Sequence, residues 1–437
     1  MTDSRSKPPR LISVRTLRLE TFAPGETPPY AILSHTWEGE EVLYTELECG
    51  SAWEKAQYDK IRNTAKQARQ DGHDYVWIDC SCINKHNAVE LSEAINKVCY
   101  ALLSDVTRSD DKVWDEAHTS LINCRYFSRG WTLQEMLAPR HVKFFAEDWT
   151  PLGLLSDISV LATRASGVPQ KVLNGETKVA ECSIAQRLSW ASPRTTTKIE
   201  DTAYCLLGIL GVSMDLRYGE GDQAFVRLQE AILMKSSDLS VLAWTDADPA
   251  KAIDLLAHSP LNFRNCHDVI HYATLEASSE HWRTDKGLKG SFAVYTVNGC
   301  EDDEDMDVKY VSLGCSHESF PEHIMALRVS AAIPAEKFES TLSVYLGLSS
   351  EDSKYATPDN RLGVIQFLRY QSTKQLESTI RWHGERPSAN NKSWARQIRA
   401  NEPQPGLEAF PSSMTGLSVV PWTPARVAHF SHGPVFL

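Results

Sequence analysis

Short apolar runs alternate with helix-type segments through the first third of the chain, and this alternation limits the fold more than any other feature. Four runs are rich in aliphatic, aromatic and β-branched residues, as buried strands are: 30–34, 75–78, 99–103 and 142–145. Between the first two runs, residues 58–68 repeat apolar positions at helical spacing, and Gly72 follows where a helix end is expected. Alternation of this kind predicts an α/β fold with a parallel sheet flanked by helices.

Two further helices are predicted around the third and fourth runs. Asn87 and Glu90 form a capping-box pattern, and apolar positions at 91–98 continue one face. Gly130 opens a second helix, which contains Glu135 about a turn from its start. The crossover between the second and third strands is then short, although it exceeds the dozen or so residues that a parallel connection needs.

The remainder of the chain changes character twice. Residues 153–245 are predicted to be mostly helical. A capping-box pattern at 197–200 opens a helix through 204–209, and Gly208 and Gly211 mark its end. A later helix is predicted at 224–232. Residues 246–437 contain short β-type runs at 292–297, 308–313, 324–329, 342–346 and 364–368. We therefore predict three parts: a parallel α/β domain at 1–152, a helical extension at 153–245 and a β-rich accessory domain at 246–437 whose tail is partly flexible.

Composition narrows the class of protein. The 437 residues are 42% hydrophobic and 23% charged, which suits a globular chain, and the net charge of −12 argues against a nucleic-acid partner. The sequence offers no secretory signal and no apolar run long enough for a membrane span, and its ten cysteines are dispersed. We predict a cytoplasmic protein with reduced thiols. Cys80 and Cys82 form C-x-C without a second ligand pair, so no metal site is predicted.

Polar and aromatic residues follow the predicted strands where each one ends. In a parallel sheet these ends meet at one edge, where α/β folds bind their ligands. An aromatic-lined crevice with a few polar groups is the usual form of a small-molecule site. We predict that the crevice binds a substrate through Ser34, His35, Thr36, Trp37, Asp79, Arg129 and Trp131.

Glu135 is the candidate catalytic residue, because its helix places one carboxylate behind this edge. Cleavage of an N-glycosidic bond builds positive charge on the ribose, and a facing carboxylate stabilises or attacks that carbon. Structural interpretations stay open beside this one. A glutamate inside a helix is usually a solvated surface residue, the tryptophans suit a core, and Asp79 suits a turn cap. The sequence lacks a Walker A loop, a G-x-S-x-G elbow and an H-E-x-x-H helix.

Four motifs stand in a characteristic order. They are Pro29–Trp37 (PYAILSHTW), Tyr75–Asp79 (YVWID), Leu91–Asn96 (LSEAIN) and Arg129–Glu135 (RGWTLQE). Together they resemble the fungal heterokaryon incompatibility (HET) domain. The stretches at 188–192, 200–208 and 218–221 resemble the region C-terminal to that domain in many members, so the resemblance covers about the first 245 residues.

The resemblance implies a role in non-self recognition between fungal strains that ends in programmed cell death. It also implies a distant similarity to Toll/interleukin-receptor (TIR) domains, and hence a flavodoxin-like sheet. Some TIR domains hydrolyse NAD with a glutamate in a W-x-x-x-E-like helix, and Trp131 and Glu135 match that pattern. NAD is then a substrate, no cofactor is expected, and the partners are a second copy or another incompatibility protein.

Two alternatives remain. The domain resembles modules that assemble without catalysis, and a non-enzymatic oligomerising module fits the same motifs. The family usually has a longer helix between the L-S-E-A-I-N motif and the third strand, whereas here Asn96 runs almost directly into it. That shortened crossover also fits a degenerate, inactive copy.

Overall fold

The structure is a computed structural model, and it describes only part of the chain in detail. The described residues are 10–23, 25–82, 98–107, 120–245 and 255–271, followed by short strand segments between 282 and 421. The chain divides into two compact units, and each is considered by itself. The first comprises Met1–Glu181 and Pro193–Gly221, and the second comprises Cys182–Ser192 and Asp222–Leu437.

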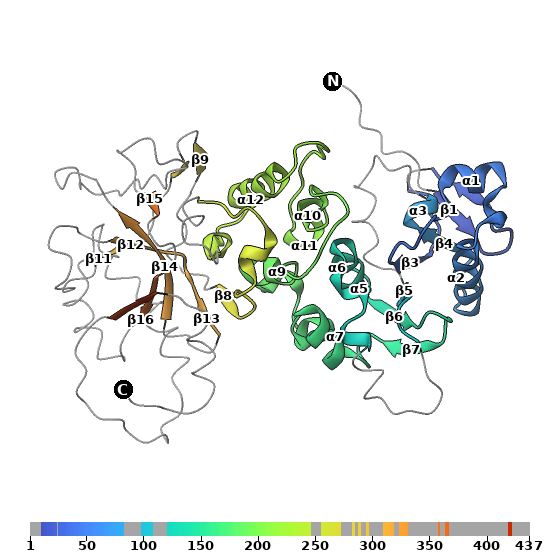
Figure 1. The fold of residues 1–437 in the computed structure, drawn as a ribbon, viewed down its shortest axis with the longest axis horizontal. Coiled ribbons are helices and arrows are strands. Elements are labelled where there is room, and N and C mark those ends of the chain that lie inside the picture. Colours follow the sequence, from blue (N-terminus) through green and yellow to red (C-terminus); the bar gives the residue numbers. More distant parts are fainter. Residues whose placement is uncertain are drawn as a thin grey trace, which may run out of the picture. The chain divides into compact units, whose positions relative to one another are not determined.

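A seven-stranded sheet forms the centre of the first unit (Figure 1). Its four inner strands run parallel and confirm the predicted α/β class: β4 (Tyr75–Ile78), β3 (Ala31–His35), β5 (Val98–Leu102) and β6 (His141–Phe145). Three antiparallel strands that were not predicted complete its edges: β1 (Arg10–Ser13) and β2 (Leu19–Thr21) beside β4, and β7 (Pro151–Leu154) beside β6.

The order of the parallel strands fixes where a ligand site belongs. Numbered along the chain, they lie in the order second, first, third, fourth. The connection direction therefore reverses between β3 and β5, and open α/β sheets bind ligands in the crevice at such a switch point. Leu33 pairs with both Ile78 and Tyr100, so the ends of β3, β4 and β5 reach the same edge.

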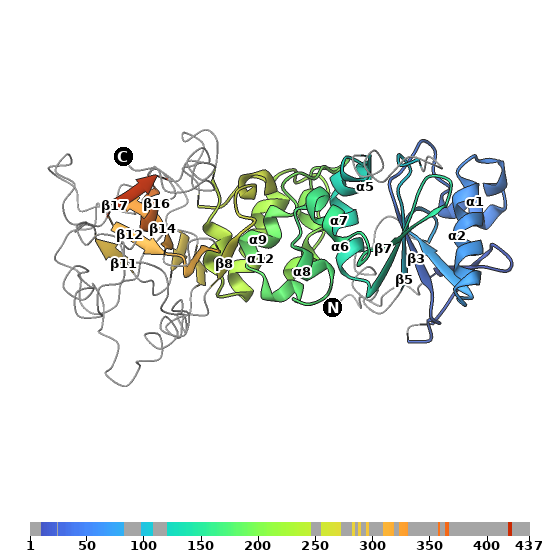
Figure 2. The same cartoon turned by 90° about the horizontal axis from the view of Figure 1, so that it is seen from below.

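Helices cover the sheet on both faces (Figure 2). On one face lie α1 (Tyr44–Cys49), the short η1 (Ala52–Glu54) and α2 (Tyr58–Gln70), with α3 (Asp79–Cys82) directly after β4. The predicted α2 buries its apolar stripe, and Gly72 follows it with the positive φ of 82° that favours glycine. On the opposite face lie α5 (Arg125–Ser128) and α6 (Gly130–Leu137), and α6 contacts both β3 and β5.

The segment after Pro193 packs against the start of α6. Thr195 accepts a hydrogen bond from Gly130 N and donates one to Ser128 O, at 2.9 and 2.7 Å. A Cβ atom on Gly130 would lie 2.5 Å from Thr196 Cγ2, so only glycine permits this approach. Glycine opens α6 because of this close contact rather than because of an unusual backbone angle.

The remaining helices of this unit are short. They are α7 (Ser159–Ser166), α8 (Gln170–Leu173), η3 (Val179–Glu181), α10 (Asp201–Tyr204) and α11 (Leu207–Leu210). The predicted capping box at 197–200 is wrong. Glu200 makes no side-chain cap, and its carboxylate instead accepts hydrogen bonds from Gly219 N and Gly221 N at 2.6 and 3.3 Å. The expected single helix is divided in two, and Gly208 lies inside α11, while Gly211 ends it as predicted.

The second unit has a helical core. It contains α9 (Ile184–Ser189), α12 (Gln223–Lys235), η4 (Leu239–Leu242) and η6 (Pro260–Phe263), with the strand pair β8 (Val269–His271) and β13 (Cys315–His317). The apolar face predicted for α12 is buried, and Gln229 exchanges two 2.8 Å hydrogen bonds with the backbone of Ala257. Trp190 and Trp244 are fully buried in this core.

Antiparallel strands follow in the same unit. β9 (Trp282–Thr284) pairs with β10 (Gly287–Lys289), and a second sheet contains β11 (Val294–Thr296), β12 (Lys309–Ser312), β14 (His323–Ser330), β15 (Thr357–Pro358), β16 (Gly363–Gln366) and β17 (Ser418–Pro421). Four of the five runs predicted here overlap these strands. The fifth, at 342–346, lies outside the described residues, as do the helix predicted at 87–98, apart from its last residue, and the tail after Arg386.

Two findings concern the whole described chain. None of its described helices is long and apolar enough to cross a membrane. The described cysteines are all free, and every one except Cys49 is buried.

Candidate functional site

Glu135 lies against the end of β3. Its Oε2 atom accepts a 2.6 Å hydrogen bond from Ser34 Oγ, which is also hydrogen-bonded to Tyr126 Oη at 3.0 Å. Ser34 and Tyr126 are 1% exposed, whereas Glu135 keeps partial access to solvent. One carboxylate therefore faces the switch point between β3 and β5 and is held by the buried Ser34 hydroxyl, which also contacts Tyr126.

This environment favours the neutral form of Glu135. Burial, followed by the negative charge of Asp79, raises the pKa of the Glu135 carboxyl to about 7, although Ser34, His35 and Arg129 oppose the shift. Burial also holds the pKa of the neighbouring Cys99 thiol well above its usual range, so this thiol stays neutral. A carboxyl group that titrates near neutrality can serve as a carboxylate or as an acid.

Trp131 and Arg129 accompany Glu135 at the start of α6. Trp131 precedes Glu135 by four residues, so both side chains lie along one face of the helix. Trp131 is half-buried, which leaves part of its ring available at the opening. Arg129 precedes the first residue of α6, and its carbonyl accepts a 2.7 Å hydrogen bond from the buried Arg194.

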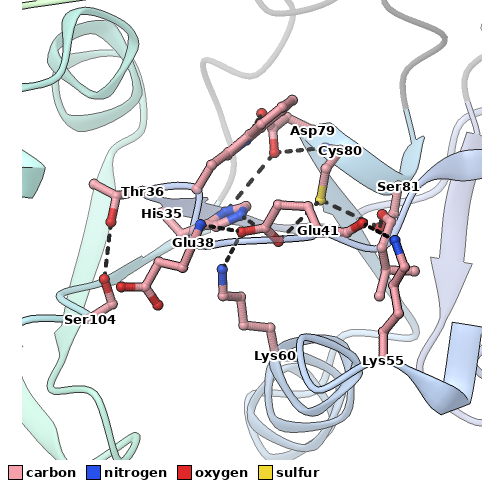
Figure 3. Close-up of polar contacts among 12 residues, drawn as sticks. His35, Thr36, Glu38, Glu41, Lys55, Lys60, Asp79, Cys80, Ser81 and Ser104 are labelled. Carbon is pink, nitrogen blue, oxygen red and sulfur yellow. Dashed lines mark hydrogen bonds and ion pairs between the residues drawn. The ribbon is translucent and has the colours of Figure 1, made fainter. Parts of the chain in front are cut away.

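His35 faces the other side of the sheet, because successive residues of a strand point in opposite directions. Its Nε2 atom lies 3.6 Å from Glu41 Oε2, and its Nδ1 atom lies 4.0 Å from Asp79 Oδ1 (Figure 3). Glu41 also accepts hydrogen bonds from Lys60 Nζ at 2.6 Å and from Glu38 N at 2.8 Å. The eight predicted site residues therefore do not all converge on one pocket.

Glu41 is ionised in this second cluster. Burial by itself raises the pKa of its carboxyl, but the interaction with the adjacent His35, and then hydrogen bonds from Lys60 and Glu38, lower it to about 2. Cys80 Sγ lies 3.9 Å from Glu41 Oε2, and burial and the charge of Asp79 raise the pKa of this thiol. The cluster thus combines a charged carboxylate, a neutral thiol and an imidazole.

The remaining predicted residues lie at the same edge of the sheet. Trp37 Nε1 donates a 2.9 Å hydrogen bond to Asp79 Oδ2, which joins the loops after β3 and β4. Asp79 also accepts from Cys80 N at 2.7 Å at the start of α3. Thr36 Oγ1 lies 3.0 Å from Ser104 Oγ, at the end of β5. Asp79 thus contacts the loop residue Trp37 and acts electrostatically on Glu135.

Sequence reasoning missed several members of both clusters. Tyr126 lies in the short helix α5, which has no periodic pattern, and Glu41 lies in a loop. Lys60 is a buried charge on the otherwise apolar face of α2, and that departure from the stripe is the one available signal.

Comparison with known proteins agrees with the resemblance that the first three motifs carry. Residues 30–101, from the start of β3 to β5, match the family model described as Heterokaryon incompatibility protein (HET). This part of the chain is therefore similar to the HET domain. Vegetative incompatibility protein HET-E-1 of Podospora anserina is 40% identical to it over 239 residues. That alignment covers 51% of this chain but 17% of the relative's length. No solved structure matches the chain.

Proposed function

We propose that this protein acts in fungal vegetative incompatibility and that its first unit hydrolyses NAD as a TIR-like domain. The incompatibility role is supported by the family match and by the name of the relative. The TIR-like assignment is supported by the strand order, which is the flavodoxin-like 2-1-3-4 for the four parallel strands. Programmed cell death through loss of NAD is the outcome this proposal implies.

The Glu135 arrangement is the observation that carries the enzymatic part. A carboxylate held at 2.6 Å by Ser34, at the edge where such sheets bind ligands, suits the stabilisation of a ribosyl cation. In the reaction, the bond between ribose C1′ and the nicotinamide nitrogen breaks, and its electron pair leaves with nicotinamide. Water adds to C1′ and loses a proton. Glu135 stabilises the charge on C1′, and Trp131 lies on the same helix face to stack on the base.

Release of nicotinamide by the purified full-length protein tests this proposal. Wild type should convert NAD to nicotinamide and ADP-ribose, and Glu135→Gln should lower the rate at least about a hundredfold, because the amide keeps the shape but carries no charge. Glu54→Gln is the matched control, since Glu54 is an exposed carboxylate of η1 in the same unit. An inert wild type leaves an assembly module or an inactive copy as the explanation. A fully active Glu135→Gln variant excludes Glu135 as the catalytic residue.

Expression in fungal cells separates those outcomes. Toxicity that Glu135→Gln abolishes, with folding and self-association unchanged, supports the enzymatic role. Toxicity that survives the substitution supports a module that works by self-association or by binding another incompatibility protein. We further propose that the strands β9 to β17 belong to a β-rich accessory domain that chooses such partners.

A further inference from the structure

Three ligand-type atoms gather on the face of the sheet opposite Glu135. Glu41 Oε2 lies 3.6 Å from His35 Nε2 and 3.9 Å from Cys80 Sγ, and one such atom from each of the three residues lies within 4.8 Å of the others (Figure 3). The side chains of His35 and Glu41 are 1% and 4% exposed, and Cys80 is 4% exposed. The described part of the chain contains no other grouping of this kind.

His35 Nε2 is the atom that requires an explanation. It is buried and has no hydrogen-bond partner among the described residues, and its 3.6 Å separation from Glu41 is too long for a hydrogen bond. A buried polar atom without a partner is rare and destabilising. This nitrogen points toward the carboxylate and the thiol, so an additional group between them would satisfy it.

The donor set identifies that group. Imidazole nitrogen, thiolate sulfur and carboxylate oxygen are the ligands of zinc, bound at roughly 2.0–2.3 Å, so ligand atoms in a tetrahedral site stand roughly 3.3–3.6 Å apart. The separation of 3.6 Å between Glu41 and His35 lies at the upper end of this range, and that of 3.9 Å between Glu41 and Cys80 is slightly above it. We infer that His35, Glu41 and Cys80 form a binding site for a zinc-type divalent cation, independent of the proposed NAD hydrolysis.

The surrounding charges suit a cation at this point. Lys60 Nζ and Glu38 N occupy Glu41 Oε1, which leaves Oε2 directed at His35 and Cys80. A divalent cation together with Lys60 balances the charges of Glu41, Asp79 and a Cys80 thiolate. Asp79 Oδ1 lies 4.0 Å from His35 Nδ1, which is beyond hydrogen-bond distance, so Asp79 contributes negative charge near the cation rather than a hydrogen bond.

The site has a structural role in the fold. Its ligands come from the end of β3, the loop that follows it and the start of α3. A bound cation therefore ties the loops that carry Trp37 and Asp79 to the edge of the sheet. The three protein ligands leave the fourth position of a tetrahedral site to a water molecule. Because the ligands are nearly inaccessible, the bound cation should exchange slowly with solvent.

Metal analysis of the purified full-length protein tests the inference. After incubation with zinc and removal of excess metal, mass spectrometry should find about one zinc per chain. Co²⁺ loaded in place of zinc should give the intense visible bands of a tetrahedral site and a thiolate-to-cobalt band in the near ultraviolet. A folded wild type that retains less than about a tenth of an equivalent overturns the inference.

Substitutions assign the ligands. Cys80→Ala and His35→Ala should each lower zinc retention at least about tenfold, whereas Cys82→Ala should retain it. Cys82 is the matched control, since it is an equally buried thiol on the same short helix whose sulfur accepts from Ile78 N. Equal retention by Cys80→Ala and wild type overturns the inference. Should these variants fail to fold, the cobalt spectrum of the wild type decides, because absence of the thiolate band also overturns it.

Discussion

At the scale of single residues, Glu135 and Glu41 show how the two faces of one sheet shift carboxyl groups in opposite directions. For Glu135, burial and then the charge of Asp79 outweigh the hydrogen bond from Ser34 and raise the pKa to about 7. Glu41 is also buried, but His35, Lys60 and a backbone N–H outweigh that burial and lower its pKa to about 2. One carboxyl group is therefore free to titrate, and the other is fixed as an anion.

The proposed hydrolysis should depend on pH through Glu135. The carboxylate is the form that stabilises a ribosyl cation, and it is lost as the pH falls through a pKa of about 7. The kcat/KM for nicotinamide release should therefore fall roughly tenfold for each pH unit below about 7 and level off above it. A rate that is flat between pH 5 and pH 8 would exclude Glu135 as the titrating group.

The same raised pKa predicts a cost in stability. The pKa of Glu135 is 4.5 in the unfolded chain and about 7 in the folded protein, so the folded protein holds this proton more tightly. The free energy of unfolding therefore falls as the pH rises from about 4.5 to about 7. Glu135→Gln should therefore raise the free energy of unfolding by about 1–3 kcal/mol at about pH 8. Urea denaturation measures this difference. It should nearly vanish at pH 4, and an equal gain at both pH values would contradict the explanation.

Lys60 should be necessary for stability because it neutralises Glu41. Lys60→Met strands a buried carboxylate and should destabilise the fold by about 3–5 kcal/mol. Arg62→Met is the matched control on the same helix, since the Arg62–Asp59 pair is 64% and 73% exposed. Its loss should cost less than about 1 kcal/mol. Similar losses for both variants in urea denaturation would show that the Lys60 pair contributes little.

At the scale of secondary-structure elements, the start of α6 is fixed by its neighbour in space. Gly130 approaches Thr196 so closely that a methyl group at Gly130 would overlap Thr196 Cγ2. The backbone pairing between Ser128, Gly130 and Thr195 holds the two segments together. The position of Glu135 in the site therefore depends on residues some 65 positions later in the chain, and the sequence around Gly130 could not reveal this.

Gly130→Ala should destabilise the protein by about 1–3 kcal/mol, because the added methyl group overpacks this contact. Thr196→Ser removes the opposing methyl group and keeps the hydroxyl that donates to Lys198 O, so the double variant should recover part of the loss. Thermal or urea unfolding of the four proteins measures this. If the changes in unfolding free energy caused by the two substitutions simply add, the proposed steric contact between residues 130 and 196 is wrong.

The inner elements could be predicted from the sequence, and the edge elements could not. Strands β3, β4 and β5 are buried almost throughout and consist mainly of apolar residues, and β6 ends in buried apolar residues, so all four are easily recognised. Strands β2 and β7 have no buried residues, and β7 contains Pro151 and Gly153, which usually argue against a strand. The helix predicted over 204–209 failed because Glu200 binds backbone N–H groups 19 and 21 residues later.

At the scale of the whole molecule, residues close in sequence belong to different units. The segment Cys182–Ser192 belongs to the second unit, while Pro193–Gly221 returns to the first. Ile184 N donates to Asp238 at 2.7 Å, and Arg194 donates to the Arg129 carbonyl at the same distance. The chain therefore passes from the first unit to the second and back before it enters the second unit again.

A fragment that ends at Leu152 should fold poorly for this reason. It lacks Arg194, Thr195 and Thr196, so the start of α6 loses its partners and buried surface is exposed. We expect no cooperative thermal transition by circular dichroism. A longer fragment that ends at His271 keeps these residues and the partners of α9, and it should unfold cooperatively. Equal behaviour of the two fragments would show that the N-terminal part is self-sufficient.

The site could be predicted only in part. The W-x-x-x-E spacing of Trp131 and Glu135 and the polar strand ends are local patterns, so the sequence displays them. The companions of these residues are not local. Tyr126 lies 92 positions from Ser34, and the atoms of His35, Glu41 and Cys80 meet without any metal-ligand spacing. Such clusters depend on which strands become neighbours, and a single sequence does not give that information.

The alternation at the end of β3 separates two adjacent residues. Ser34 contacts Glu135 on one face of the sheet, and His35 lies beside Glu41 on the other face. Substitutions on one face of the strand can therefore change the chemistry there and leave the packing on the other face unchanged, although Ser34 and His35 are adjacent in the sequence. Inserting one residue earlier in this strand would exchange the two environments, so relatives should tolerate length changes before β3 but not within it.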